Sequence, residues 1–296
     1  MTTFLSLTIN GLAMGMVYAL IAMGLVILVR AVGVMNFAQG DLLALGAYIT
    51  CAFIVDVKLP FWAFIPVTLL CFAAIAIIFM FTCYWPLRKA SYVQAVIVAT
   101  IGASICIREL CIKIWGPIAI NMPAIIQDHE TNSGLVINLF GVNLQIQFLL
   151  TIGICFALIL LVFLLFEKLY AGRMMEAAAQ DKYAAELIGI PTIVTTMATY
   201  IIVVTIVSYG GFMIAPIYFV STSLALHQLR AFAGVVIGGF GNIKGAVIGS
   251  VFVGLIEAYS SVWFSTYKDA VVFLILIVVL IFRPQGIFGE KIADKA

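Results

Sequence analysis

The strongest constraint on the fold of this chain is a series of long apolar stretches, each near the length of a membrane-crossing helix. They lie at about residues 4–29, 37–55, 60–84, 92–112, 147–166, 191–209, 212–240, 245–264 and 268–282. A bilayer core requires roughly 20 apolar residues per helix. Lipid offers the backbone no hydrogen bonds, so each crossing segment must satisfy its own backbone groups as a helix. The sequence therefore predicts one all-α domain over residues 1–296, a polytopic transmembrane helical bundle with eight or nine spans.

The stretch at 212–240 differs from the others because it is rich in glycine and holds Pro216, His227 and Arg230. Proline and glycine interrupt helices, so we expect a broken or re-entrant segment here. His129 and His227 fall in or near expected loops, and we interpret both as solvated loop residues. No spacing of His and Cys is typical of a metal site, so no bound metal is expected.

The positions of Lys and Arg favour one orientation. With the N-terminus outside, the cytoplasmic connections hold ten of them and the outer connections hold three. The ten are Arg30, Arg88, Lys89, Lys168, Arg173, Lys182, Lys244, Arg283, Lys291 and Lys295, and the three are Lys58, Lys113 and Lys268. This distribution obeys the positive-inside tendency, and the inverted topology violates it. We therefore expect a cytoplasmic C-terminus and an outer loop over 113–147, in which LVINLFGVNLQIQ forms a small hairpin or lies on the membrane surface.

One charged island, GRMMEAAAQDKYAAELIGIP at 172–191, stands out in a chain that is only 9% charged. Its Ala, Met, Gln and Glu residues favour a helix, and Gly189 and Pro191 favour its end. We predict a cytoplasmic helix over 172–190. Small side chains gather on one arc of that helix, with Asp181 in the middle: Met174, Ala177, Ala178, Ala184, Ala185 and Ile188. The arc suits close contact with another protein; a solvated helix lying on the membrane is the alternative.

Several blocks of sequence carry a family resemblance. Residues 11–48 read GLAMGMVYALIAMGLVILVRAVGVMNFAQGDLLALGAY, and residues 234–258 read GVVIGGFGNIKGAVIGSVFVGLIEA. The charged island has the form G-R-x-M-x-A-x-A-Q-D, and SSVWFSTYKDAVVF and FRPQGIFG occur near the end. In this order the blocks resemble the permease subunits of ABC importers for branched-chain amino acids, over nearly the whole chain. The chain departs from the family pattern at Gln39, where His is frequent, and at 242–244.

The resemblance implies a multi-pass protein of the bacterial inner membrane that translocates leucine, isoleucine and valine. It implies two ATPase subunits, a second homologous permease, an extracytoplasmic substrate-binding protein and membrane lipid as partners. The charged helix would couple to the ATPase through Arg173, Glu176, Ala177, Ala178, Asp181 and Gly189. The sequence holds no G-x-x-x-x-G-K-S/T phosphate loop. We therefore expect no enzyme activity and no cofactor in this chain, with ATP and Mg on the partner subunits.

Polar and glycine residues near the spans are the candidates for the substrate pathway. Asn36, Gln39 and Asp41 are expected at the cytoplasmic start of the second span, where they line the pathway or cap the helix. In the capping interpretation Asn36 is the N-cap and Gln39 is the third helical residue. Three glycines of the second block, Gly238, Gly239 and Gly241, either line the pathway or allow tight packing.

The remaining charges within the spans carry further expectations. Arg108 and Glu109 are expected to extend from the fourth span toward the membrane surface. Arg230 and Glu257 are expected to pair across neighbouring spans. A stand-alone secondary transporter or channel would need buried carboxylates for ion coupling, and Asp41 and Glu257 are its candidates.

Two further alternatives concern the class of protein and its cargo. The same architecture importing urea, short amides or other amino acids stays open, because no residue reports the cargo. An intramembrane enzyme is disfavoured, since the sequence lacks a zinc or Ser/His constellation. Nucleic acid is excluded as a partner, because no basic cluster is larger than Arg88-Lys89.

Overall fold

The computed structural model describes all residues except 1, 89–93, 127–133, 140–141 and 290–296. Seven helices of this part of the chain are long and apolar enough to cross a membrane. They are α1 (Thr2–Val32), α3 (Phe61–Phe79, extended by a π-helical turn, η1, at Met80–Tyr84), α4 (Gln94–Trp115), α5 (Ile146–Lys168), α8 (Thr192–Ile214), α10 (Ile243–Trp263) and α11 (Lys268–Phe282, after a 3-10 turn, η3, at Ser265–Tyr267). The shorter apolar helix α2 (Gln39–Val55) adds one more. The predicted polytopic all-α bundle is confirmed.

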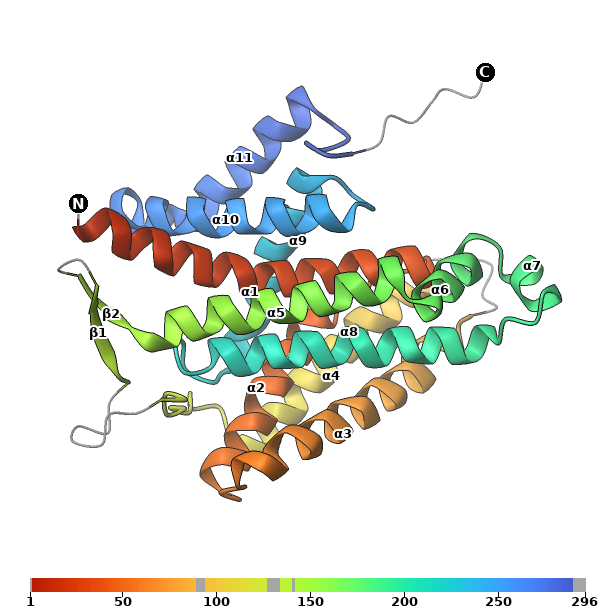
Figure 1. Cartoon of the computed structure of the whole chain (residues 1–296), viewed down its shortest axis with the longest axis horizontal. Helices are drawn as coiled ribbons and strands as arrows, with labels where there is room; N and C mark the ends of the chain where they lie inside the picture. The colour runs from red at the N-terminus through yellow and green to blue at the C-terminus, as the bar shows by residue number, and fades with distance from the viewer. Residues whose placement is uncertain (1, 89–93, 127–133, 140–141, 290–296) are drawn as a thin grey trace.

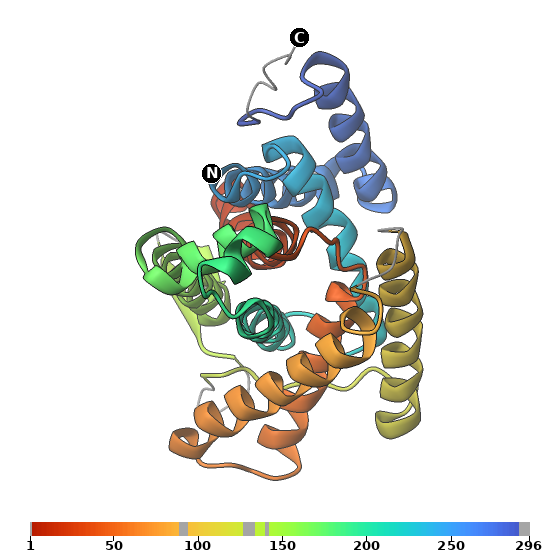
Figure 2. The ribbon, with the colours of Figure 1, turned by 90° about the vertical axis from the view of Figure 1, so that its right-hand side faces the viewer.

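Helix α1 forms the centre of the bundle. Nearly every side chain between Ala13 and Leu28 is buried. Neighbours α10, α8 and α5 pack along this helix, and Figure 2 shows them around it. A Cβ on Gly254 of α10 would collide with the backbone of Gly15, so the two helices approach each other through their glycines. This is the small-residue packing by which membrane helices associate without a hydrophobic driving force.

The expected span at 212–240 is not one continuous helix. Helix α8 extends to Ile214, and after a turn the chain forms a short 3-10 helix, η2 (Thr222–Leu226), and then α9 (His227–Gly238). At 1.5 Å per residue the 12 residues of α9 rise only about 18 Å, less than a bilayer core. The predicted break in the segment at 212–240 is therefore confirmed. His227 is buried rather than solvated, so that expectation was wrong, and His129 lies outside the described residues.

A β-hairpin stands at one end of the bundle. Strands β1 (Val136–Leu139) and β2 (Val142–Gln145) pair antiparallel, with Val136 opposite Gln145. The hairpin predicted within the 113–147 connection is confirmed. Figure 1 shows it beside the N-terminus, at the end of the bundle that we call the hairpin end.

The charged island lies at the opposite end, which we call the α6 end (Figure 1). It forms two helices, α6 (Tyr170–Gln180) and α7 (Lys182–Leu187), rather than the single helix predicted over 172–190. The chain is extended at Asp181, with φ −149° and ψ 104°, and this residue ends α6 and begins α7. Aspartate competes with helical hydrogen bonding through its own side chain, which explains why it interrupts the helix.

Candidate functional site

Helix α6 is fixed to the rest of the bundle. Met175 is buried at 4% exposure, and the Glu176 carboxylate pairs with the Arg30 guanidinium of α1 at 2.9 Å. A Cβ on Gly172 would lie 2.5 Å from the Phe166 backbone, so glycine allows α6 to fold back closely on α5. The helix therefore moves with α1 and α5 rather than as a free arm.

Helix α7 is stabilised by specific residues at both of its ends. The Asp181 carboxylate accepts a hydrogen bond from the Ala184 amide at 2.9 Å, as an N-cap. After the helix, Gly189 adopts φ +85°, a left-handed conformation that favours glycine. The Thr192 hydroxyl donates to the Glu186 carboxylate at 2.6 Å. Asp181 is thus a capping residue and not the centre of a continuous contact arc, which corrects the prediction.

Three apolar side chains of this region point away from the protein. Tyr183 is 73% exposed, Leu187 71% and Ile188 76%. We call them the α7 patch. Of this patch, only Ile188 lies on the predicted arc, because that arc assumed an unbroken helix. Large apolar side chains exposed together at the end of a bundle are typical of a protein contact surface.

The predicted coupling residues have different surroundings. Arg173 is exposed and lines a cavity of about 260 Å³ together with Arg30 and Glu176. Ala177 and Ala178 are half-buried on α6. Their coupling role stays a prediction.

The polar residues before α2 lie deep in the bundle. The Gln39 amide donates to the Ile21 carbonyl of α1 at 3.0 Å. Ile21 precedes Arg30 by nine residues, which is about 13 Å along the helix. Helix α2 therefore begins well inside the α6 end, not at its surface.

The capping interpretation of this region is wrong. Ala38 is the N-cap of α2 and makes no side-chain cap, and Gln39 is the first helical residue rather than the third. The Asn36 side chain instead accepts from the Ala38 amide at 2.9 Å and shapes the turn before the helix. In this segment the Asn36 Nδ2 and Gln39 Oε1 atoms are buried without a partner among the described residues.

Asp41, in the first turn of α2, is paired with α4. Its carboxylate is only 3% exposed and accepts hydrogen bonds from the Ser104 hydroxyl and, at 3.3 Å, from Arg108 Nε. Arg108 was expected to extend to the membrane surface. In the structure its Nε instead donates to Asp41. Helices α2 and α4 are thus joined by a charge pair with a buried carboxylate and a partly exposed guanidinium.

The start of α9 meets the start of α2. The Gly40 amide donates to the Gln228 side-chain oxygen, and the Gln228 side-chain nitrogen donates to the Asn36 carbonyl at 3.3 Å. His227 Nδ1 bonds the Leu224 carbonyl at 2.9 Å. Two helices therefore begin next to each other inside the bundle.

The glycines between α9 and α10 have packing roles. A Cβ on Gly238 would collide with the Gly245 backbone, and Gly239 and Gly241 adopt φ +113° and +92°. Gly241 also lines a cavity of about 780 Å³ at the α6 end, with Lys244 among its other residues. Their place in a substrate pathway stays a prediction.

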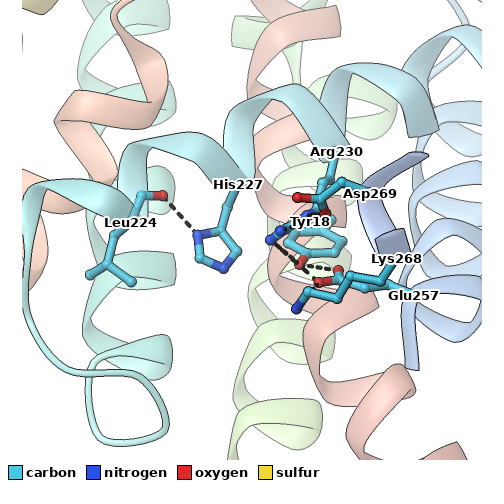
Figure 3. A network of polar contacts seen from close by, with 7 residues as sticks. All are labelled: Tyr18, Leu224, His227, Arg230, Glu257, Lys268 and Asp269. Atoms are coloured by element: carbon cyan, nitrogen blue, oxygen red, sulfur yellow. Dashed lines mark hydrogen bonds and ion pairs between the residues drawn. The ribbon is translucent and has the colours of Figure 1, made fainter. Parts of the chain in front are cut away.

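A charge cluster joins α1, α9, α10 and α11 (Figure 3). The Glu257 carboxylate accepts from the Tyr18 hydroxyl at 2.6 Å and pairs with Arg230 at 3.4 Å and Lys268 at 3.1 Å. Arg230 also binds Asp269 through two nitrogens, at 2.8 and 3.0 Å. The predicted pairing of Arg230 with Glu257 is confirmed. Glu257 is neutralised by two cations, as Asp41 is by one.

Metal binding finds no support in the part of the chain that the structure describes. No group of three or more His, Cys, Asp or Glu residues there is placed to hold a metal ion.

Helices that begin inside a membrane-spanning bundle are typical of transport proteins, because they place polar groups at the depth where a cargo passes. The fold and these sites thus define a multi-pass membrane transport protein. The family model described as "Branched-chain amino acid transport system / permease component" matches residues 7–280. The chain belongs to this family.

Curated relatives match over nearly their whole length. The high-affinity branched-chain amino acid transport system permease protein LivH of Escherichia coli is 29% identical, over 99% of this chain and 97% of the relative. The corresponding permease protein BraD of Pseudomonas aeruginosa is 29% identical, over 99% and 98%. Among solved structures, PsaBC from Streptococcus pneumoniae in complex with Fab is similar with a TM-score of 0.48, at 15% identity, over 92% and 89% of the two chains.

Proposed function

We propose that this chain is the membrane-spanning subunit of an ATP-driven importer, and that its cargo is the branched-chain amino acids leucine, isoleucine and valine. Membership of the permease family and the names of its relatives support this cargo. The membrane would be the inner membrane of a bacterium. Urea, short amides and other amino acids are the competing cargoes for the same architecture.

The orientation that we propose has the N-terminus outside and the C-terminus in the cytoplasm, with the α6 end facing the cytoplasm. Two ion pairs of the α6 end, Arg30 with Glu176 and Lys244 with Glu167, place both cations there. Lys168 and Arg173 lie at the junction of α5 and α6. Excess Lys and Arg on one side is the usual mark of the cytoplasmic face.

The α7 patch is the single observation that carries the mechanism. It exposes three large apolar side chains on the water-facing end of a bundle whose sequence has no phosphate-binding loop of its own. Hydrolysis of ATP therefore takes place on separate subunits, and the α7 patch docks one of them. Glu176 ties α6 to α1 through Arg30, Arg173, Ala177 and Ala178 belong to the coupling surface of α6, and Asp181 and Gly189 shape α7, so that closure of the ATPase moves the bundle.

The assembly contains two ATPase subunits, which bind ATP and Mg, and a second homologous permease. An extracytoplasmic binding protein delivers the cargo to the hairpin end. Within this chain, the cargo passes the polar start of α2, with Asn36, Gln39 and Asp41, and leaves beside Gly238, Gly239 and Gly241. The cavity of about 780 Å³ at the α6 end supports that exit.

The test is reconstitution of the permease with its ATPase subunits, its second permease and its binding protein in proteoliposomes. We expect ATP-dependent uptake of labelled leucine, isoleucine and valine, and no uptake of urea, acetamide or lysine. ATPase subunits with an inactivated phosphate loop provide the matched control. Leucine uptake that persists with those subunits would contradict the ATP-driven mechanism, and preferential uptake of urea would contradict the cargo.

A further inference from the structure

Helix α4 is unlike the other helices on the outside of the bundle. Arg108 and Glu109 are both exposed, six to seven residues before Trp115, which is about 10 Å inside the end of the helix. The central parts of α3, α5 and α11 carry no Asp, Glu, Lys, Arg or His. Exposed charges at such depth face a water-filled cavity or another protein rather than lipid. This side of α4 therefore faces water or another protein rather than lipid, and in a water-filled cavity a polar solute reaches it.

The pair between Asp41 and Arg108 is incompletely bonded. Arg108 contacts Asp41 through Nε alone, and its side chain is 43% exposed. By contrast, Arg230 binds Asp269 through two nitrogens. The two terminal nitrogens of Arg108 have no hydrogen-bond partner in the described part of the chain. A guanidinium in this state has donors left for a carboxylate, which it binds best with two parallel hydrogen bonds.

An apolar cavity lies at the same α2–α4 contact as this pair. It has a volume of about 490 Å³ and lies between α2, α3 and α4. Its lining does not include the three polar residues themselves but their chain neighbours, Leu42 after Asp41, Ala103 before Ser104 and Ile107 before Arg108. Small-molecule sites commonly have volumes of roughly 300–1,000 Å³.

We propose that Asp41, Ser104 and Arg108, which we call the α2–α4 site, bind the zwitterionic head of an α-amino acid, and that the adjoining cavity takes its branched apolar side chain. This inference rests on the proposed function and deepens it. The ligand carboxylate binds the terminal nitrogens of Arg108, and its ammonium group binds the Asp41 carboxylate. The apolar lining from α2, α3 and α4 favours an isobutyl, sec-butyl or isopropyl group.

Charge balance explains why the empty site is stable and why it selects a zwitterion. Without ligand, Asp41 and Arg108 neutralise each other. With ligand, each keeps a partner of opposite charge, so no buried charge is left unpaired. Leucinamide offers no carboxylate to the terminal nitrogens of Arg108, and 4-methylpentanoate offers no ammonium group to the Asp41 carboxylate. Both analogues retain the side chain of leucine, so their exclusion tests the head-group contacts alone.

The native Cys106 reports on this site, because it is exposed and lines the same cavity. The experiment measures its alkylation rate by peptide mass spectrometry in the assembled permease–ATPase complex, without the binding protein. We expect leucine to slow alkylation at least fivefold, and leucinamide and 4-methylpentanoate to leave the rate unchanged. Asp41→Asn and Arg108→Gln should abolish the protection. Asp56→Asn, the same change at the exposed end of α2, is the matched control and should keep it.

A second variant covers the case in which the charge variants fail to assemble. A Cβ on Gly102 meets no atom within 4 Å, and Gly102 lines the cavity, so Gly102→Leu adds apolar volume at the cavity wall without a clash at its Cβ. It should reduce protection by leucine more than protection by alanine.

The inference is overturned if Cys106 does not react in the ligand-free complex. It is equally overturned if leucine fails to protect Cys106, or if Asp41→Asn and Arg108→Gln both transport leucine at the normal rate. Loss of the proposed function looks different, because the unaltered complex then takes up no leucine at all.

Discussion

Leu187→Ala is expected to weaken docking of the ATPase subunit about tenfold. Complete burial of a leucine side chain is worth roughly 1.5–3 kcal/mol. Leu187 is 71% exposed in the chain alone, so most of that free energy is still to be gained when a partner covers it. The truncation should therefore cost about 1.5 kcal/mol of binding free energy, which is about tenfold in the dissociation constant. Folding should be unaffected, because the side chain makes little contact within the chain.

The assay measures binding of the purified ATPase subunit to the immobilised permease, alongside ATP-dependent uptake. Leu161→Ala is the matched control, since Leu161 is 59% exposed on the membrane-spanning helix α5. It removes the same atoms from a surface that lipid covers, and the affinity should not change. Normal affinity in Leu187→Ala, or equal losses in both variants, would refute the reasoning.

Four further outcomes are expected. Asp181→Ala removes the N-cap of α7, about 1 kcal/mol, and should lower substrate-stimulated ATPase activity, whereas Asp181→Asn keeps the cap and the activity. Gly254→Leu overpacks the α1–α10 contact and should lower the thermal unfolding temperature of the solubilised protein, at a cost of about 3 kcal/mol or more. Glu257→Gln leaves Lys268 without its carboxylate and Arg230 with Asp269 alone, and should destabilise by about 1–3 kcal/mol in the same assay, against under about 1 kcal/mol for Asp269→Asn, whose side chain is 55% exposed. Arg30→Gln should reduce uptake more than stability, as measured by transport and unfolding of the same preparation.

Hydropathy predicts most of the helices because it is a local property of the chain. The stretch expected at 147–166 is α5, Ile146–Lys168, and the one expected at 245–264 is α10, Ile243–Trp263. The depth at which a helix begins is not local. The start of α2 is fixed by the bond from Gln39 to the Ile21 carbonyl, a contact that hydropathy does not encode.

The site residues show the same difference between local properties and contacts that depend on the fold. Arg230 and Glu257 were paired from sequence because each is an isolated charge within an apolar stretch. The Asp41–Arg108 pair was missed because Arg108 lies near a helix end, where an extended side chain explains it equally well. Tyr183 and Leu187 of the α7 patch were missed because their exposure depends on the break at Asp181, where a capping aspartate outweighs the helix propensity of the alanines around it.

The expected effect of Arg30→Gln follows from the position of α1 between the α7 patch and the start of α2. Its pair with Glu176 lies on exposed side chains, 43% and 45%, and such pairs contribute under about 1 kcal/mol to stability. Yet the pair joins α6, which carries the α7 patch, to the helix whose Ile21 carbonyl holds Gln39 at the start of α2. A displacement of α6 by the ATPase thus reaches α2 through α1, and Arg30→Gln should uncouple hydrolysis from uptake without unfolding the protein. Equal losses of uptake and thermal stability would show that the pair only braces the bundle.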